Sequence, residues 1–224
     1  MPDKLLITYL LVDALFLGGG VVMLTIALMG KAKIQSEPTI DNVAERLLFA
    51  HCPQLGEIIS AGLVFFTFIL SIPGILQPGD RVWIKIHGWM VVISAFTTLL
   101  IGLVIWFLTL RTRSMLNLAW GKEPARVQSL LQQRFNCCGY HNSTSPPFQV
   151  DATCPTDLAA AQKPGCVGPF STFANSFLDV IFTTDFGIVA VDAVLLLCVA
   201  MVLKDRKERA RYRLIDSKNG FGTI

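Results

Sequence analysis

A chain of 224 residues that is 53% hydrophobic and only 16% charged is too apolar for an ordinary soluble domain, in which about a quarter of the residues are charged. The formal net charge of +3 is small and gives no indication of nucleic-acid binding. The apolar residues occur in long blocks rather than alternating with polar ones, which indicates an integral membrane protein.

Four stretches are long enough to cross a bilayer as helices, which takes about 20 apolar residues each. They cover residues 5–29, 56–76, 88–110 and 182–203. The first is longer than the apolar part of a signal peptide, so we expect it to be retained. Because a backbone in lipid must hydrogen-bond internally, the sequence predicts an all-α fold, a four-helix transmembrane bundle. Its connections are residues 30–55, 77–87 and 111–181, and its tail is residues 204–224.

The distribution of lysine and arginine predicts the orientation of these helices. These residues are denser at both ends of the chain and in 77–87 than in the other two connections. The positive-inside rule therefore places both termini and the tight turn, with its Gln77-Pro78-Gly79-Asp80 turn pattern, in the cytoplasm. Residues 30–55 then form a small extracellular loop and residues 111–181 a large one.

Four of the six cysteines lie in the large loop, at Cys137, Cys138, Cys154 and Cys166. An even number of cysteines in an oxidising compartment indicates disulfides, here two. A bond between the adjacent Cys137 and Cys138 would be strained, which leaves two possible pairings. Adjacent cysteines also lack the usual spacing of zinc ligands, so we expect no metal site.

A helix is predicted immediately before the cysteine pair, over residues 124–135, because apolar residues recur there at helical spacing. Gly139 follows the pair and frees the backbone to turn sharply. The two thiols are therefore expected to leave the turn in different directions. Their disulfides would then connect this short element to two distant parts of the loop.

The run Phe135-Asn-Cys-Cys-Gly-Tyr140, between the third and fourth spans, resembles the signature of the tetraspanin family. Span order and loop sizes agree over essentially the whole chain, Gly165-Cys166 is similar to the family's terminal Gly-Cys element, and Gly18-Gly19-Gly20 is similar to its glycine-rich first helix. The resemblance implies two disulfides, Cys137 with Cys166 and Cys138 with Cys154.

The chain also departs from the family pattern. Thr153-Cys154 lacks the proline and serine of the family's middle cysteine element, and the third span has no polar residue equivalent to those of other members. The short loop and the few cysteines resemble fungal members, particularly the branch associated with host penetration by infection structures (appressoria).

The resemblance implies a membrane scaffold rather than an enzyme. Such a protein organises partner membrane proteins through the loop surface at residues 140–164 and through its helices, which also self-associate. It would act at the plasma membrane or in endosomes, in contact with lipids and with a sterol-sized cavity among the spans, without another cofactor or a soluble small-molecule substrate. The alternative is an accessory subunit of a channel or transporter, which would need a polar pathway.

Polar residues within the spans are the candidates for such a pathway or for contacts between helices. Asp13 in the first span and Asp192 in the fourth lie at similar depths, where a charged carboxylate is costly. We expect the two to share a hydrogen bond, with at least one protonated. That contact would either pack the helices together or act as a conformational latch. Ala14 and Gly18 form a small-residue pair that favours close helix packing.

Two positions are candidates for covalent modification. Asn142-Ser143-Thr144 is an N-glycosylation sequon in the large loop. Cys198, near the predicted cytoplasmic end of the fourth span, is either a palmitoylation site or a small buried apolar residue.

Overall fold

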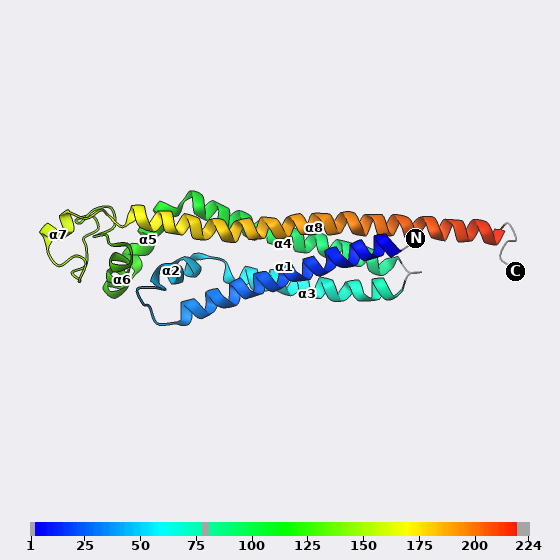
Figure 1. The fold of residues 1–224 in the computed structure, drawn as a ribbon, viewed down its shortest axis with the longest axis horizontal. Coiled ribbons are helices and arrows are strands. Elements are labelled where there is room, and N and C mark those ends of the chain that lie inside the picture. The colour runs from blue at the N-terminus through cyan, green and yellow to red at the C-terminus, as the bar shows by residue number, and fades with distance from the viewer. Residues whose placement is uncertain (1–2, 78–80, 219–224) are drawn as a thin grey trace. The chain divides into compact units, whose positions relative to one another are not determined.

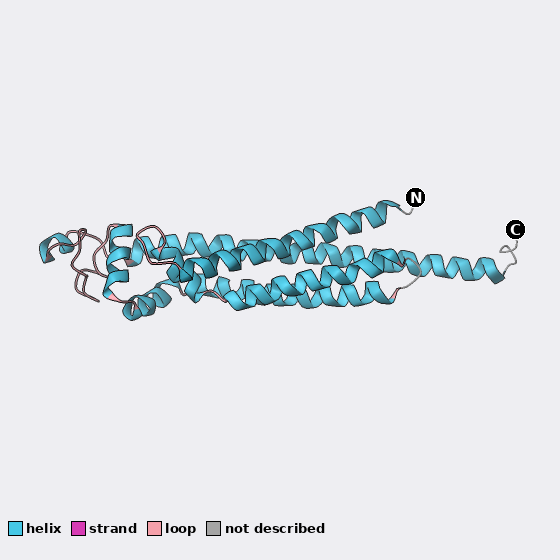
Figure 2. Ribbon diagram, turned by 90° about the horizontal axis from the view of Figure 1, so that it is seen from below, coloured by secondary structure: helices cyan, strands magenta, loops and turns pink. Residues whose placement is uncertain are grey.

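A computed structural model of the protein describes residues 3–77 and 81–218, and these residues form eight helices (Figure 1). In chain order the helices are α1 (Asp3–Gln35), α2 (Val43–His51), α3 (Gln54–Leu76), α4 (Val82–Leu110), α5 (Thr112–Lys122), α6 (Ala125–Phe135), α7 (Asp157–Ala161) and α8 (Val167–Lys218). Figure 2 shows that helices and loops make up the described chain, which confirms the all-α prediction.

The chain divides into two compact units. Unit 1 comprises Met1–Thr25, Leu55–Leu100 and Asp185–Ile224, and unit 2 comprises Ile26–Gln54 and Ile101–Thr184. Helices α1, α3, α4 and α8 contribute residues to both units, α3 only through Gln54, whereas α2, α5, α6 and α7 belong to unit 2 alone.

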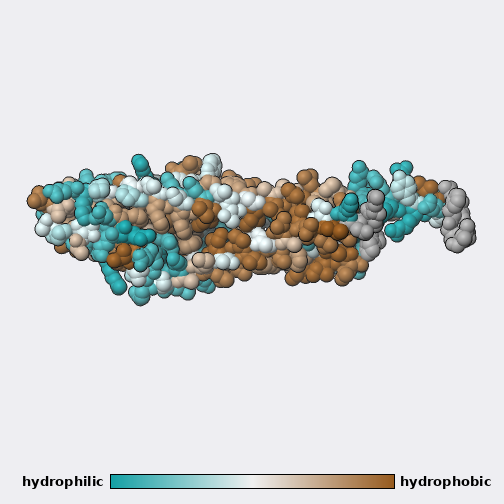
Figure 3. All heavy atoms as spheres, in the orientation of Figure 1, coloured by the Kyte–Doolittle hydropathy of each residue, from teal (hydrophilic) through white to brown (hydrophobic). Residues whose placement is uncertain are grey.

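Helices α1, α3, α4 and α8 are each long and apolar enough to cross a membrane. Apolar side chains cover most of the visible surface over α1 and α3 (Figure 3). A surface of this kind is stable only against lipid, because water would not solvate it. The protein is therefore a multi-pass membrane protein, as the sequence predicts.

The helices extend beyond the apolar stretches from which they were predicted. Helix α1 continues past residue 29 to Gln35, and the predicted small loop contains α2. Helix α8 begins at Val167, inside the predicted large loop, and continues through the predicted tail as far as Lys218. Residues 219–224 of that tail lie outside the described residues. Charged residues mark where a helix leaves the hydrocarbon, but the helix itself continues wherever one face can pack or its side chains can be solvated.

The predicted turn at 77–87 is shorter than expected, because α4 already begins at Val82. Pro78, Gly79 and Asp80 of the turn pattern lie outside the described residues. Ile84 is fully buried and packs close to Gly74 of α3, which explains why this apolar segment continues the helix. One consequence is that His87 lies within a membrane-spanning helix and not in a loop.

The core of unit 1 consists of large apolar side chains from all four spanning helices. Its fully buried members include Tyr9, Phe16, Val64, Ile84, Val91 and Leu195. Helices α1 and α3 approach each other so closely at Gly20 that a Cβ atom added there would lie 2.6 Å from Cγ1 of Val64. Gly18, predicted to pack a neighbouring helix, has open space at the same position, and Ala14 is exposed.

Replacing Gly20 by alanine should therefore destabilise the protein by about 1–3 kcal/mol through overpacking. Gly18→Ala is the matched control and should change stability by less than about 1 kcal/mol, in the stabilising direction expected from helix propensity. Thermal unfolding in detergent, followed by circular dichroism, measures both. Equal effects of the two substitutions would show that α1 and α3 do not meet at Gly20.

Candidate functional site

The most extensive apolar core of unit 2 joins the two predicted extracellular loops. Helix α2 contributes Val43 and Leu47, α5 contributes Leu116 and Trp120, and α8 contributes Phe170, all of them buried. The sequence treats residues 30–55 and 111–181 as separate loops, but their apolar faces pack together. The small loop is thus part of the same folded unit as the cysteine-rich segment.

Two disulfides cross-link this unit. Cys137 is bonded to Cys166, with Cα atoms 5.0 Å apart, and Cys138 is bonded to Cys154, with Cα atoms 6.0 Å apart. This is the pairing that the family resemblance implies. All four cysteines are fully buried, so the two cross-links lie inside the unit and not on its surface.

The backbone around the cysteine pair explains how adjacent residues reach different partners. Helix α6 ends at Phe135, and the next residue, Asn136, adopts the left-handed conformation that asparagine tolerates better than most residues (φ 50°). Gly139 also has a positive φ, 69°, and a Cβ atom there would overlap the carbonyl oxygen of Asn142. Two backbone hydrogen bonds join this turn to the segment around Cys166. The amide of Cys138 donates to the carbonyl of Pro164 at 3.0 Å, and the amide of Cys166 donates to the carbonyl of Gly139 at 3.0 Å.

Gln132 is a buried hydrogen-bonding centre that sequence reasoning missed. Its side-chain amide donates to the carbonyl of Gln149 and to Oδ2 of Asp151, both at 2.8 Å. Its side-chain oxygen accepts from the amide of Gln149 at 2.9 Å and lies 3.4 Å from the amide of Gly139. One side chain therefore aligns the segment after the sequon with the end of α6. No local pattern indicated this role, because Gln132 lies beside the predicted apolar face of residues 124–135 and not on it.

Asp151 completes this arrangement from the other side. Its Oδ1 accepts hydrogen bonds from the amides of Thr153, at 2.8 Å, and Cys154, at 2.7 Å. Its Oδ2 also accepts from the hydroxyl of Ser129 at 2.9 Å. The loop that carries Cys154 is thus held to α6 by polar contacts as well as by the disulfide.

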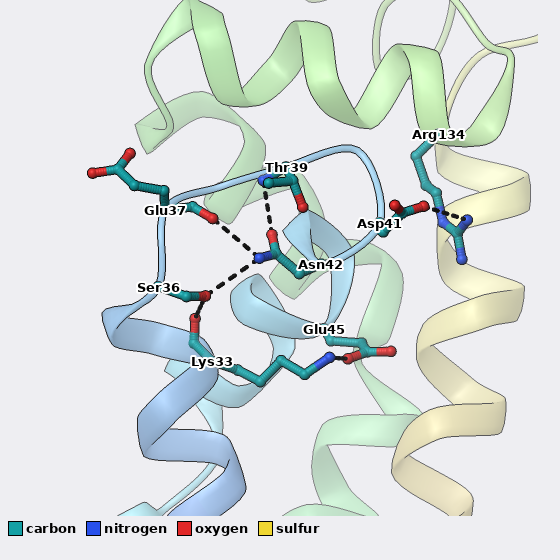
Figure 4. Close-up of polar contacts among 8 residues, drawn as sticks. All are labelled: Lys33, Ser36, Glu37, Thr39, Asp41, Asn42, Glu45 and Arg134. Atoms are coloured by element: carbon teal, nitrogen blue, oxygen red, sulfur yellow. Dashed lines mark hydrogen bonds and ion pairs between the residues drawn. The ribbon is translucent and has the colours of Figure 1, made fainter.

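The small loop between α1 and α2 is organised by Asn42 (Figure 4). The Asn42 side chain accepts from the amide of Thr39 at 2.8 Å and donates to the carbonyl of Glu37 at 3.0 Å. Lys33 and Glu45 form an ion pair across the loop. In Figure 4 the carboxylate of Asp41 faces the guanidinium of Arg134 on α6, 3.8 Å away at the nearest atoms.

Tyr140, next to the cysteine turn, is fully buried against Trp120, with ring centroids 5.7 Å apart. Its hydroxyl donates to the carbonyl of Arg113 at 2.7 Å. Burial raises the pKa of this hydroxyl to about 12, against a smaller opposing effect of the Arg113 guanidinium. Tyr140 therefore stays a neutral hydrogen-bond donor that attaches the turn to the start of α5.

The segment between the disulfides supplies the exposed surface of unit 2 that the sequence singles out. Asn142 is exposed, and its side-chain oxygen accepts from both the amide and the hydroxyl of Thr144 at 3.0 Å. Val150 and Leu158 expose 77% and 74% of their surface.

Unit 2 also contains an apolar cavity of about 250 Å³, lined by Ile26, Met29, Phe49, Phe177, Val180 and Ile181.

In unit 1 the structure gives Asp13 partners that the sequence did not suggest. The hydroxyl of Ser71 on α3 donates to Asp13 Oδ2 at 2.7 Å, and Nε2 of His87 on α4 lies 3.6 Å from Asp13 Oδ1. Nδ1 of His87 is 3.1 Å from the carbonyl of Thr67. All of these groups are buried. Asp13 thus connects α1 to α3 and α4. Sequence reasoning missed His87 because it assigned this residue to the turn at 77–87.

Asp192 does not form the predicted hydrogen bond with Asp13. It is fully buried, and neither carboxylate oxygen has a hydrogen-bond partner in the described part of the chain. The expectation that the two share a hydrogen bond, as a packing contact or as a latch, is therefore wrong in this structure. Two further carboxyl groups, Glu57 of α3 and Asp185 of α8, are also buried.

Cys198 is only 4% exposed and packs in the core of unit 1, which favours the interpretation as a small buried apolar residue. Within residues 3–77 and 81–218, no group of three histidine, cysteine, aspartate or glutamate residues is placed to hold a metal ion.

Comparisons of the chain with known protein families, curated proteins and solved structures give no match.

Replacing Gln132 by leucine should destabilise unit 2 by roughly 2–4 kcal/mol, since each buried polar group left unpaired costs about 1–3 kcal/mol. Thermal unfolding of the full chain in detergent, with the disulfides intact, measures the change. Gln133→Leu is the control, because Gln133 makes one side-chain hydrogen bond within α6, to Ser129, and should shift stability by about 0.5 kcal/mol or less. Similar losses in both variants would contradict a central role for Gln132.

Proposed function

We propose that the protein is a tetraspanin-like scaffold, which organises partner membrane proteins through unit 2 and through its membrane-spanning helices. The observation that carries this proposal is the pair of disulfides from Cys137 and Cys138, which hold an exposed segment on a buried framework. A surface prepared in this way loses little conformational entropy when a partner binds.

The proposed contact surface is residues 140–164, the segment between the cysteine turn and the terminal Gly-Cys element. Val150 and Leu158 support it, because each places a large apolar side chain in solvent on this segment. Apolar side chains at this exposure contribute nothing to the fold, but they gain stability when a partner covers them. We further propose a fungal infection structure as the setting and a sterol as a lipid partner, both on the family resemblance.

We also propose that unit 2 faces the cell exterior and that both termini are cytoplasmic, at the plasma membrane or in endosomes. The distribution of lysine and arginine supports this orientation, and buried disulfides need an oxidising compartment to form. The exposed sequon at Asn142 provides a direct test, because the glycan is added only on the luminal side.

Expression in a eukaryotic secretory pathway should give a protein whose electrophoretic mobility increases on enzymatic deglycosylation. Asn142→Gln should abolish that shift, whereas Ser143→Ala, which leaves the sequon intact, should retain it. Digestion within residues 111–181 by a protease added to the cytosolic side of sealed microsomes would refute the orientation.

The scaffold function is tested by capture of partners from the native membrane. The tagged full chain is cross-linked, purified in mild detergent and compared with the double variant Val150→Ser/Leu158→Ser. We expect the variant to reach the membrane with unchanged disulfides and to lose a specific set of co-purifying membrane proteins by about tenfold, the loss expected when one or two contact residues are removed.

The matched control is Leu118→Ser on α5, which removes an apolar side chain of similar exposure, 67%, outside the proposed surface. It should leave the captured set unchanged. If both variants retain the same partners, the segment is not the recognition surface, and the proposed function fails in this form.

A further inference from the structure

A polar cavity of about 370 Å³ lies in unit 2 where α4 ends and α5 begins. Its lining includes Arg111 between these helices, Arg113 and Ser114 from the first turn of α5, and Asn175 from α8. None of its lining residues is acidic. The cavity has no role in the arrangement of the disulfides or of the segment between them.

The position of the cavity along α4 places it at the level of the lipid headgroups. Trp106, Phe107 and Leu110, in the last turns of this membrane-spanning helix, expose 38%, 56% and 63% of their surface. Side chains of this kind are covered by acyl chains in a bilayer, and aromatic residues favour its interface. Arg111 follows directly, so its guanidinium stands at the boundary where lipid phosphates lie.

The two arginines provide unneutralised positive charge at this boundary. Both are exposed, and neither guanidinium forms an ion pair with a carboxylate among residues 3–77 and 81–218. Guanidinium groups bind phosphate through two parallel hydrogen bonds, which gives them a geometric preference for this anion. Helix α5 also begins here with no acidic residue in its first turn and no side-chain cap.

Asn175 adds a positioned neutral donor. Its side-chain oxygen accepts from the hydroxyl of Thr112 at 2.6 Å, which fixes the amide plane and leaves the NH₂ group to donate to a ligand. The backbone of the site is fixed as well, because the carbonyl of Arg113 accepts from the buried Tyr140 hydroxyl. The donors are therefore held in place before any ligand arrives.

We propose that this cavity binds the phosphate of an anionic phospholipid in the leaflet at the end of α4. The acyl chains lie along Phe107 and Leu110, and the phosphate is bound by Arg111, Arg113 and Asn175. Two positive charges favour a headgroup with net negative charge over a zwitterionic one. Because Tyr140 connects the cavity to the cysteine turn, a bound lipid also fixes the start of α5 beneath that turn. The proposal does not depend on the scaffold function.

The test measures lipid binding to the purified full chain by native mass spectrometry, with phosphatidylglycerol and phosphatidylcholine as probes. Wild type should bind phosphatidylglycerol more tightly than phosphatidylcholine. Arg111→Gln/Arg113→Gln should weaken phosphatidylglycerol binding by about tenfold or more, since each basic residue near the headgroups contributes substantially to anionic-lipid affinity. Folding should be unaffected, because neither guanidinium forms an ion pair with the described part of the chain.

The matched control is Lys122→Gln/Arg126→Gln, which removes the same charge from exposed positions of unit 2 outside the cavity. It should change the affinity by no more than about twofold, as expected for charges remote from a bound headgroup. Arg111→Lys/Arg113→Lys should recover part of the affinity, because the charge remains but the paired geometry does not.

Three outcomes would overturn the proposal. If Arg111→Gln/Arg113→Gln and its control weaken phosphatidylglycerol binding equally, the lipid is attracted by the overall positive charge and does not bind at this cavity. Equal binding of phosphatidylcholine and phosphatidylglycerol would remove the preference for an anionic headgroup. Binding of inorganic phosphate at least as tight as that of phosphatidylglycerol would show a site for the free ion instead.

Discussion

The fold of unit 2 depends on two neighbouring half-cystines bonded to partners 29 and 16 residues further along the chain. Each cross-link removes conformational freedom from the unfolded chain and stabilises by roughly 3 kcal/mol in the chain-entropy model. These neighbouring residues reach such different partners because the backbone turns sharply at the two positions that flank them. The left-handed Asn136 and the positive φ of Gly139 make that turn, so the position of α6 relative to the start of α8 follows from one short segment.

Polar contacts then decide which conformation the cross-linked segment adopts. A segment with few apolar residues cannot select its conformation by burial alone. Gln132 of α6 instead hydrogen-bonds the backbone of Gln149 and the side chain of Asp151, and Asp151 in turn accepts from the amides of Thr153 and Cys154. The small loop adds apolar contacts through α2. The apolar core of unit 2 therefore includes segments that precede α3 in the sequence and segments that follow it.

In unit 1 the contribution of polar groups has a different physical basis. Helices surrounded by lipid gain little from apolar burial, so close packing and interhelical hydrogen bonds select their partners. Asp13 meets Ser71 and approaches His87, while the buried Asp192 has no hydrogen-bond partner among the described residues. Two carboxyl groups that look equivalent by depth therefore have different environments, and only one of them joins helices in this structure.

The sequence by itself determined the membrane class, the four apolar helices and the helix before the cysteine pair, because block hydrophobicity and helical spacing are local properties. It did not determine the full length of α1 and α8, since charges end a membrane span without ending a helix. Residues brought together from distant segments were beyond it: the core shared by α2 and α5, the bonds of Gln132 with Gln149 and Asp151, and the hydrogen bond of Asp13 with Ser71. These contacts were decided by the tertiary structure, because the energy of a buried polar group depends on which partner lies within hydrogen-bond distance, and no local pattern records that.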